Sequence, residues 1–545
     1  MLRNRCGRRK PKQRDDERQI SPIDSGLAGN PEEHGYSRQV SKHDRIPRLY
    51  ALDDLGSQCA IILKRHVDVR VCISHDEEND IATPSDIYVN SAQGRTESDG
   101  TIEGTPFQEF VLLETTTTEK IIKPARNLTG TLRLPGDKSI SHRYALLGGL
   151  AEGNTTIANF STGADPASSL GCVAALGAKV DWLEDDRVVI TGTAGKFTPS
   201  ASPLDCGNSG STMRMMAGLL APQSGEFTLI GDASLTRRPM ERIRKPLAQM
   251  GANITLTEGH APVIVSGAAL HGIDYTTPVP SAQVKTALLF AGLQAEGTTT
   301  IRESVRTRDH GELALRAFGA QLTRTVDSVS ITGKQQLKGI DATVPGDMSS
   351  AAFFLCAAAL FPESNLVLDG LGLNPTRATL LDVLTALGAT VAVLNLEEKH
   401  GELVGTVQLN PPPGGMGGTT VSGALAAQLI DELPVLAAIA PYTRNGIRIR
   451  DAQELRVKES DRIALVVKNL RAMGAEVEEF EDGLDVPGGQ QLHGAQIDSG
   501  GDHRIAMAFS VAALRAEGET AILGAESAGI SFPEFFELLD TVAER

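Results

Sequence analysis

Between residues 145 and 524 the chain repeats one sequence pattern six times. In each copy an apolar run rich in Ala and Leu ends at a turn residue and passes into a β-like run, as in ALLGGLAEGNTTIANF at 145–160. The turn residues recur about every 70 residues, at Gly153, Gly225, Gly297, Ser364, Gly446 and Gly518. Self-similarity at a near-fixed period indicates repeated structural units. We therefore expect six related α/β units.

A second signature alternates with the first and marks a helix end. It occurs in the phrases LGAKV, MGANI, FGAQL, LGATV and MGAEV, with glycines at Gly177, Gly251, Gly319, Gly388 and Gly474. Gly is favoured just after a helix because it adopts the left-handed conformation there, and a strand-like run follows each one. Each unit should carry two helices and several strands. One helix per unit is apolar nearly all round and should be buried.

Two nearly identical phrases, LPGD at 134–137 and VPGD at 344–347, divide the six units into two sets of three. Pro-Gly pairs favour turns, so we expect the chain to cross between two lobes at these places. One lobe would hold 121–136 plus 345–545, and the other would hold 137–344. A single continuous assembly of six units is the alternative.

Residues 1–120 do not share the repeat. They open with the basic stretch MLRNRCGRRKPKQR, which acidic residues follow at once, and they contain one short apolar patch at 59–73. The mixed charge argues against an organelle transit peptide, and no apolar signal segment supports secretion. Poor periodicity predicts disorder or weak order. We expect 1–120 to be an N-terminal extension that is disordered or that precedes the true start of the chain.

The composition of the whole chain disfavours several classes of function. The formal net charge is −16, which argues against broad nucleic-acid binding. No apolar run reaches the ~18–20 residues that a membrane span needs. The six Cys are scattered without CxxC spacing, so neither a zinc ribbon nor a disulfide framework is indicated. A reducing cytoplasm is the expected location.

Polar side chains stand just before the buried helix of every unit. In chain order they are Lys138, Ser139, Ser141 and Arg143; Asn208, Ser209, Gly210, Ser211 and Arg214; Ser281, Gln283 and Lys285; Asp347, Ser349 and Ser350; Asp431 and Glu432; and Asp502, His503 and Arg504. Free N–H groups and the helix dipole make helix starts good sites for phosphate or carboxylate groups. Simple N-capping by Ser, Asn or Asp is the alternative for any one copy.

Cations oppose the dipole at a helix start, and this holds for Lys138, Arg143, Arg214 and Arg504. An anionic ligand between them would remove that conflict. Further along, Asp431, Glu432 and Glu459 supply carboxylates, and paired carboxyls in a desolvated cationic cleft suit proton transfer. The alternative for RVKESDR at 456–462 is a solvated helix start with a Glu459–Arg462 pair.

Several familiar chemistries lack their sequence signatures. The stretch Gly136–Ser139 is similar to the end of a P-loop, but Asp137 breaks the sequence and the upstream Gly spacing is wrong. No GxGxxG opens a βα unit, and no HExxH is present. We therefore expect neither a cofactor nor a metal ion.

The chain closely resembles the 5-enolpyruvylshikimate-3-phosphate (EPSP) synthase family, the glyphosate target of the shikimate pathway and aromatic amino-acid biosynthesis. The resemblance covers about 121–540 and rests on LPGDKSISHR, GNSGSTMR, GDASLTRRPM, SAQVKTALL, TRDH, VPGDMSSAAF, IDELPVLA, ELRVKESDR, GGDHRIAM and SFPEF. SLTRRPM and SAQVK are more similar to the class II branch, and Ile530 stands where class I members have a Lys. The resemblance implies two closing lobes, each of three βαβαββ units, with the active site in the cleft between them. We expect a monomer.

The resemblance also implies a reaction and its residues. The enolpyruvyl group of phosphoenolpyruvate would pass to the 5-hydroxyl of shikimate-3-phosphate, with release of phosphate. Shikimate-3-phosphate would lie on Lys138, Ser139, Arg143, Ser281, Ala282, Gln283, Arg308, Asp431 and Lys458. Phosphoenolpyruvate would lie on Lys138, Gly210, Arg238, Gln283, Arg462 and Arg504. The implied catalytic residues are Asp431, Glu459, Lys458 and Lys138, with the two carboxylates moving protons.

Two alternatives stay open. UDP-N-acetylglucosamine enolpyruvyl transferases share the fold and the chemistry, but they usually carry a Cys or Asp in a mobile loop near GDASLTRRPM, which has no Cys here. A non-catalytic anion-binding protein is the second alternative. It is disfavoured because both carboxylates and all the cations are present together.

Overall fold

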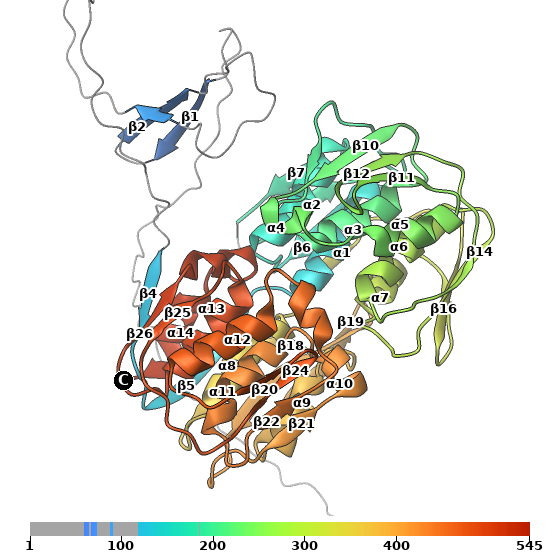
Figure 1. Ribbon diagram of the computed structural model, residues 1–545. Helices are drawn as coiled ribbons and strands as arrows, with labels where there is room; N and C mark the ends of the chain where they lie inside the picture. The colour runs from blue at the N-terminus through green and yellow to red at the C-terminus, as the bar shows by residue number, and fades with distance from the viewer. Residues whose placement is uncertain (1–58, 65–66, 73–87, 91–117, 185) are drawn as a thin grey trace, which may run out of the picture. The chain divides into compact units, whose positions relative to one another are not determined.

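The computed structural model describes residues 59–64, 67–72, 88–90, 118–184 and 186–545 (Figure 1). The chain divides into two compact units, Met1–Val111 and Leu112–Arg545. In the first unit, β1 (Cys59–Lys64), β2 (Val67–Cys72) and β3 (Tyr88–Asn90) form an antiparallel sheet. Strands β1 and β2 lie in the apolar patch noted in the sequence. The other residues of the predicted extension, up to 117, lie outside the described residues.

Six small sheets make up the described part of Leu112–Arg545, which confirms the six predicted α/β units. Five of them share one order, in which the first two strands are parallel and the next two neighbours are antiparallel. In spatial order, these five sheets are β17 (Asp341–Thr343), β6 (Asn154–Ala158), β8 (Val188–Thr191) and β7 (Lys179–Trp182); β9 (Leu204–Asp205), β10 (Glu226–Ile230), β12 (His260–Ser266) and β11 (Asn253–Thr257); β13 (Asp274–Thr276), β14 (Thr298–Arg302), β16 (Ser328–Thr332) and β15 (Leu322–Arg324); β5 (Asn127–Arg133), β18 (Asn365–Gly372), β20 (Glu402–Asn410) and β19 (Thr390–Lys399); and β21 (Thr419–Val421), β22 (Ile447–Ile449), β24 (Gly483–Val486) and β23 (Glu478–Phe480).

The sixth sheet has only three strands, and one of them comes from the start of the segment Leu112–Arg545. Strands β25 (Gln496–Asp498) and β26 (Thr520–Leu523) are parallel, and β4 (Glu119–Ile122) pairs antiparallel with β26. The last strand, β27 (Ala543–Glu544), pairs antiparallel with β5. Strand β4 near the start of Leu112–Arg545 and strand β27 at its end thus each pair with a strand from the other end of that segment.

Each unit has a buried first helix and a second helix on its sheet. The first helices are α1 (Lys138–Leu150), α3 (Gly210–Leu220), α6 (Ala282–Gly292), α8 (Met348–Ala359), α11 (Leu433–Ile439) and α13 (His503–Ala513). The second helices are α2 (Ala164–Ala175), α5 (Glu241–Gln249), α7 (His310–Ala317), α9 (Thr379–Ala386), α12 (Arg462–Ala472) and α14 (Phe535–Val542). Shorter helices are α4 (Ala233–Thr236), α10 (Gly423–Gln428), η2 (Ala440–Tyr442), η3 (Gln453–Val457) and η4 (Ala525–Ile530).

The glycines predicted to end the second helices do so. All five have left-handed backbone, with φ from 88° at Gly474 to 104° at Gly177. Residues with a Cβ rarely adopt this conformation, so these positions favour Gly. Within the described residues, every helix is too short or too polar to span a bilayer.

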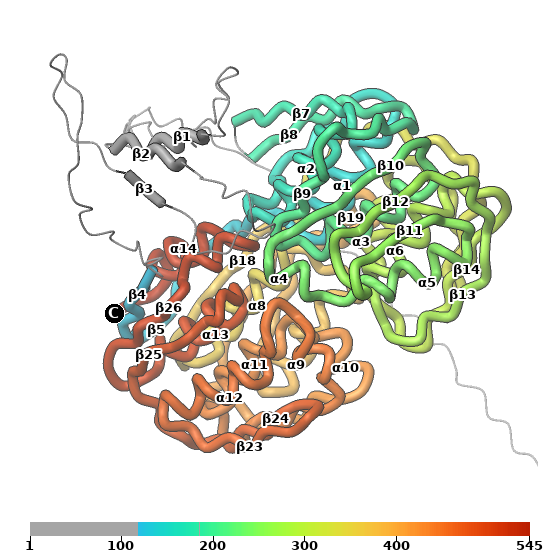
Figure 2. Tube along the Cα trace, turned by 45° about the horizontal axis from the view of Figure 1, so that its top comes forward, coloured from blue at the N-terminus to red at the C-terminus, as the bar shows by residue number. Residues whose placement is uncertain are grey.

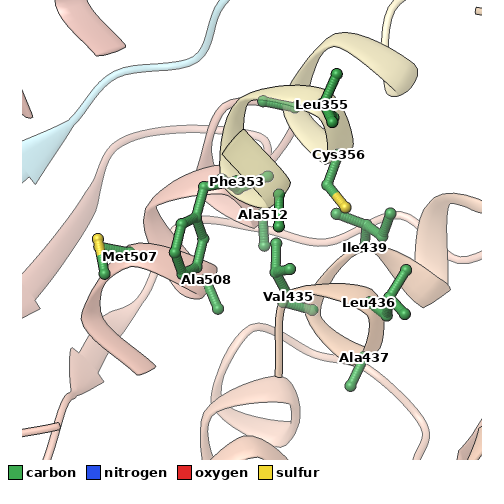
Figure 3. Close-up of a cluster of buried hydrophobic side chains, with 14 of the residues drawn as sticks. Phe353, Leu355, Cys356, Val435, Leu436, Ala437, Ile439, Met507, Ala508 and Ala512 are labelled. Atoms are coloured by element: carbon green, nitrogen blue, oxygen red, sulfur yellow. The ribbon is translucent and has the colours of Figure 1, made fainter. Parts of the chain in front are cut away.

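The buried hydrophobic side chains form two clusters. Core I contains Leu128 and residues from Met348 to Val542, and α8, α11 and α13 pack against one another in it (Figures 1 and 3). Figure 3 shows Phe353 of α8, Val435 of α11 and Ala508 of α13 converging there. Core II runs from Ile140 to Val344, and α1, α3 and α6 pass through it (Figure 2). The predicted burial of one helix per unit is confirmed.

The chain passes between the two cores at 134–137 and 344–347, and the two crossings bind each other. The Asp137 N–H donates to the Pro345 carbonyl at 2.7 Å, and the Asp347 N–H donates to the Pro135 carbonyl at 3.1 Å. Each crossing leads at once into a helix. Asp137 caps α1 by accepting from Ile140 N–H at 2.9 Å, and Asp347 caps α8 by accepting from an N–H at 2.7 Å. The starts of α1 and α8 are therefore held side by side.

Candidate active site

The cations of α1 face two neighbouring helices of core II. Lys138 Nζ donates to Asp165 of α2 at 3.1 Å. Arg143, one turn later and buried, donates to the Ser139 carbonyl at 2.8 Å and to Thr286 Oγ1 of α6 at 3.0 Å. Burial lowers the pKa of Arg143 to about 10. Both cations thus have protein partners, so the conflict with the helix dipole is partly relieved without a ligand.

The starts of α3 and α6 are joined through Gln283. Its side-chain oxygen accepts from Arg214 Nη1 at 2.6 Å, and its amide nitrogen donates to Ser211 Oγ at 2.8 Å. Gly210 lies beside this pair, and a Cβ added there would lie 3.0 Å from Arg214 Nη1 and 3.4 Å from Arg238 Nη1. The missing side chain of Gly210 therefore leaves room for two guanidinium groups.

Asp431, just before α11, is surrounded by cations. Arg308 Nη1 donates to its Oδ2 at 2.7 Å. Four further cationic groups have a nitrogen 3.8–4.0 Å from its carboxylate: Arg377, Lys458, Arg462 and Arg504. Arg504 Nη1 also donates to the Asp431 carbonyl at 2.8 Å. The predicted Asp431 and its predicted neighbours Lys458, Arg462 and Arg504 are thus brought together.

Glu459 has its own pair of cations. It accepts from Arg462 Nη2 at 2.6 Å, and Arg238 Nη1 lies 3.4 Å from its other oxygen. Arg462 is the first residue of α12 and donates from Nε to Asp502 at 2.8 Å. The Glu459–Arg462 pair expected for a solvated helix start is present, but the Arg462 side chain is only 1% exposed. The alternative of a solvated helix start therefore does not hold at Arg462, although Lys458 to Asp461 are half-buried.

Among the ion pairs that join the core I and core II sides, two end on these carboxylates. Arg308, which precedes α7, reaches Asp431, and Arg238, which follows α4, reaches Glu459. Ser234 Oγ of α4 also donates to the Glu459 carbonyl at 3.3 Å. In the described part of the chain, no hydrogen bond or ion pair joins Lys138, Arg143 or Gln283 to either carboxylate. The Ser139 carbonyl accepts from Arg143, and the Ala282 carbonyl accepts from Thr286.

The cations hold both carboxylates in the ionised form. Burial raises the pKa of Asp431, but Arg308, Arg504 and Lys458 outweigh it and keep that pKa well below its usual value. Burial likewise raises the pKa of Glu459, but Arg462 and Arg238 outweigh it and keep that pKa well below its usual value. Burial lowers the pKa of Lys458, although the nearby Asp431 carboxylate raises it. Without a ligand, Asp431 and Glu459 are therefore ionised at neutral pH.

N-capping explains part of the polar pattern. Side chains accept from first-turn N–H groups of α1, α3, α6, α8 and α13, at Asp137, Ser209, Ser281, Asp347 and Asp502. The capping alternative is confirmed at these positions, while the side chain of Glu432 makes no cap at α11. The caps already satisfy some of the N–H groups, so fewer of these groups are free to bind an anion.

Asp165 and Arg377 are charged residues of this network that were not predicted from the sequence. Asp165 is the partner of Lys138, and Arg377 contacts Asp431 from the loop before α9. The prediction looked before the first helix of each unit, but Arg377 precedes the second. Arg308 stands at the matching place before α7, so the repeat itself carried the missing signal. Among the described residues, no group of three or more His, Cys, Asp or Glu side chains could hold a metal ion.

Comparisons with known proteins agree on one family. Residues 122–539 match the family described as EPSP synthase (3-phosphoshikimate 1-carboxyvinyltransferase). The 3-phosphoshikimate 1-carboxyvinyltransferase of Koribacter versatilis is 61% identical over 424 residues, which is 78% of this chain and 99% of that protein. The enzyme of the same name from Solibacter usitatus is 52% identical over 78% of this chain and all of its own length. A solved structure of EPSP synthase from Acinetobacter baumannii superposes with a TM-score of 0.70 at 38% identity, covering 78% of this chain and 98% of that one.

Proposed function

The chain belongs to the EPSP synthase (3-phosphoshikimate 1-carboxyvinyltransferase) family, and on that premise we propose that Asp431, Glu459 and the cations around them carry its reaction. The enzyme transfers the enolpyruvyl group of phosphoenolpyruvate to the 5-hydroxyl of shikimate-3-phosphate and releases phosphate. The observation that carries the proposal is that both carboxylates, from the core I side, contact arginines from the core II side. Two anionic substrates can meet there between acids and bases.

Shikimate-3-phosphate is proposed to lie between α1, α6 and Asp431. Its phosphate would face the starts of α1 and α6, where Lys138, Ser139, Arg143, Ser281, Ala282 and Gln283 stand. Arg308 and Lys458, which already contact or approach Asp431, would hold the ring hydroxyls and the carboxylate. This places the 5-hydroxyl near Asp431, where an ionised carboxylate can accept its proton.

Phosphoenolpyruvate is proposed to lie beside Glu459. Arg238 and Arg462 flank that carboxylate, and Arg504 and Lys138 complete a ring of cations for the phosphate and the carboxylate of this substrate. Gly210 and Gln283 would line the same place. Preorganised cations stabilise charge as it moves in a desolvated site.

The proposed chemistry follows from these placements. Asp431 accepts the proton of the 5-hydroxyl as the oxygen bonds to C2 of the enolpyruvyl group, and a proton adds at C3. The tetrahedral intermediate then loses phosphate from C2 and a proton from C3. Glu459 is ionised in the free protein, but incoming anions take up its cations and raise its pKa, so it can bind the proton that C3 receives. Lys458 and Lys138 balance the charge on the reacting groups.

We also propose that the two cores mark two lobes, with 121–136 plus 345–545 in one and 137–344 in the other. The members of core I and core II support this division, since each falls on its own side of the crossings. The monomeric state and the cytoplasmic location stay predictions.

Arg238 gives the sharpest test of the substrate placement. Arg238→Lys keeps the charge but loses the planar fork that can bind phosphate or carboxylate through two N–H groups. In a phosphate-release assay with both substrates, we expect the KM for phosphoenolpyruvate to rise by about 10- to 100-fold. The Kd for shikimate-3-phosphate should stay close to that of the wild type. The neighbouring exposed Arg237 supplies the matched control, Arg237→Lys, which should leave both constants unchanged.

An unchanged KM for phosphoenolpyruvate in Arg238→Lys would contradict the placement. The same assay separates the rival activity, because UDP-N-acetylglucosamine offered in place of shikimate-3-phosphate should release no phosphate.

A further inference from the structure

Arg377 is a buried arginine surrounded by four carboxylates. Its side chain is 3% exposed. Nη2 donates to Asp347 at 3.2 Å, Nε lies 3.7 Å from Asp137, and Nη1 lies 3.5 Å from Glu432 and 3.8 Å from Asp431. Among the described residues, no acceptor makes a hydrogen bond with Nε or Nη1. One guanidinium group therefore lies within 4 Å of four carboxylates. Two of its nitrogen atoms make no hydrogen bond to the described residues at these distances.

These four carboxylates fall into two pairs by their positions in the fold. Asp137 and Asp347 are the last residues of the two chain crossings and cap α1 and α8. Asp431 and Glu432 precede α11, and Asp431 is the proposed proton acceptor. Arg377 is thus the side chain that links both crossings to the reacting carboxylate.

The other cations of Asp431 stand in the proposed substrate site. Asp431 faces Arg308 from before α7, Lys458 from after η3, Arg462 from α12, Arg504 from α13 and Arg377 from before α9, with Glu432 beside it. Arg308 is 17% and Lys458 25% exposed, and both can turn toward an anionic ligand. Arg377 is enclosed by protein groups, so it stays with Asp431 when a substrate occupies the other two.

We propose that Arg377 is a positioning residue for Asp431, which ties this carboxylate to the chain crossings and keeps it balanced by a cation while substrates hold Arg308 and Lys458. This inference rests on the proposed role of Asp431. Removal of Arg377 would leave Asp137 and Asp347 as buried carboxylates without their cation, and it would let the Asp431 side chain shift. A small misplacement of a reacting group is costly to turnover.

The test compares Arg377→Gln and Arg377→Lys with the wild type by kcat, both KM values, the pH dependence of kcat and thermal unfolding. Arg377→Gln should lower kcat by about 10- to 100-fold and change KM much less. Loss of a nearby cation raises the pKa of a carboxylate, so the acid limb of kcat should move to higher pH in Arg377→Gln. Arg377→Lys should keep the acid limb of the wild type and recover part of kcat.

Arg450 provides the control. It is a partly buried core I arginine that donates to the Ile449 and Leu484 carbonyls instead of carboxylates, so Arg450→Gln should leave the acid limb in place. In Asp431→Asn protein, the added change Arg377→Gln should have little further effect on kcat.

Two contrary outcomes are distinguishable, one against the role of Arg377 and one against the role of Asp431. An acid limb at the pH of the wild type in folded Arg377→Gln, beside an inactive Asp431→Asn, would refute the role of Arg377 alone. Full turnover in Asp431→Asn would refute the proposed role of Asp431 as well. If Arg377→Gln does not fold, Arg377→Lys decides: kcat reduced about threefold or more with KM values like those of the wild type supports the role, and an unchanged kcat contradicts it.

Discussion

Arg308 and Arg238 each face a carboxylate in the free protein and are each proposed to receive an anionic substrate. Their distances of 2.7 Å to Asp431 and 3.4 Å to Glu459 show that these cations already balance the two carboxylates. An incoming anion competes for the same guanidinium groups and thereby raises the pKa of the carboxylate that loses its partner. Substrate binding and proton uptake at this site should therefore be linked.

Gly210 provides a prediction at the same scale. Its backbone begins the helix α3 and its φ is not positive, so an Ala is compatible with the backbone. A methyl group there would contact the flexible ends of Arg214 and Arg238 at 3.0 and 3.4 Å. The family resemblance implies that glyphosate occupies the phosphoenolpyruvate site in a longer form, so the methyl should crowd the inhibitor more than the substrate.

We expect the wild type to be inhibited by glyphosate in competition with phosphoenolpyruvate. Gly210→Ala should raise the inhibition constant by about tenfold or more and the KM for phosphoenolpyruvate by a smaller factor. Inhibition constants of both proteins measure this. Equal values would mean that Gly210 serves the turn of GNSGS and has no part in selectivity.

At the scale of elements, the sequence repeat was a good predictor because each unit must bury one apolar helix and end the other at a left-handed Gly. These local requirements leave marks such as LGAKV and MGAEV, and Gly177 and Gly474 have the expected φ. The shared strand order of five sheets could not be predicted in this way, because pairing depends on contacts between distant segments. The closing of one sheet by β4 is an example, since its partner β26 lies about 400 residues away in sequence.

Gly136 tests the crossings as structural elements. A Cβ on this residue would lie 1.9 Å from the Asn159 carbonyl oxygen and 2.9 Å from Val344 Cγ1, so the second crossing would have to move. We expect Gly136→Ala to lower the free energy of unfolding by about 1–3 kcal/mol or more and to reduce turnover. Urea denaturation gives the first quantity and phosphate release the second.

The matched control is Gly171→Ala in α2. An added Cβ there would meet no atom within 4 Å in the described part of the chain, and Ala favours a helix over Gly by up to about 1 kcal/mol. This variant should be as stable as the wild type or more stable. A Gly136→Ala protein that matches Gly171→Ala in stability and activity would show that the crossing tolerates movement.

At the scale of the whole molecule, carboxylates from the core I side meet arginines from the core II side at the candidate site. The motif resemblance identified the members Asp431, Glu459, Arg238 and Arg308, but the partners that each would have in the free protein depend on how the cores face each other. Arg377 shows the same limit, because its position matches that of Arg308 in the repeat but its four carboxylates come from three distant segments. The sequence thus named candidate residues for the site, and the structure shows which charges lie beside each of them.

The most direct test of this account is the turnover of Asp431→Asn, measured as phosphate released from shikimate-3-phosphate and phosphoenolpyruvate, with shikimate-3-phosphate binding measured on the same protein. Asn keeps the shape of the side chain and removes the proton acceptor, so we expect kcat to fall by about 100- to 10,000-fold while binding is retained in part. Asp485→Asn, which removes a carboxylate paired with Arg448 on an exposed sheet, is the control and should keep wild-type turnover. Turnover of folded Asp431→Asn equal to that of the wild type would contradict the account.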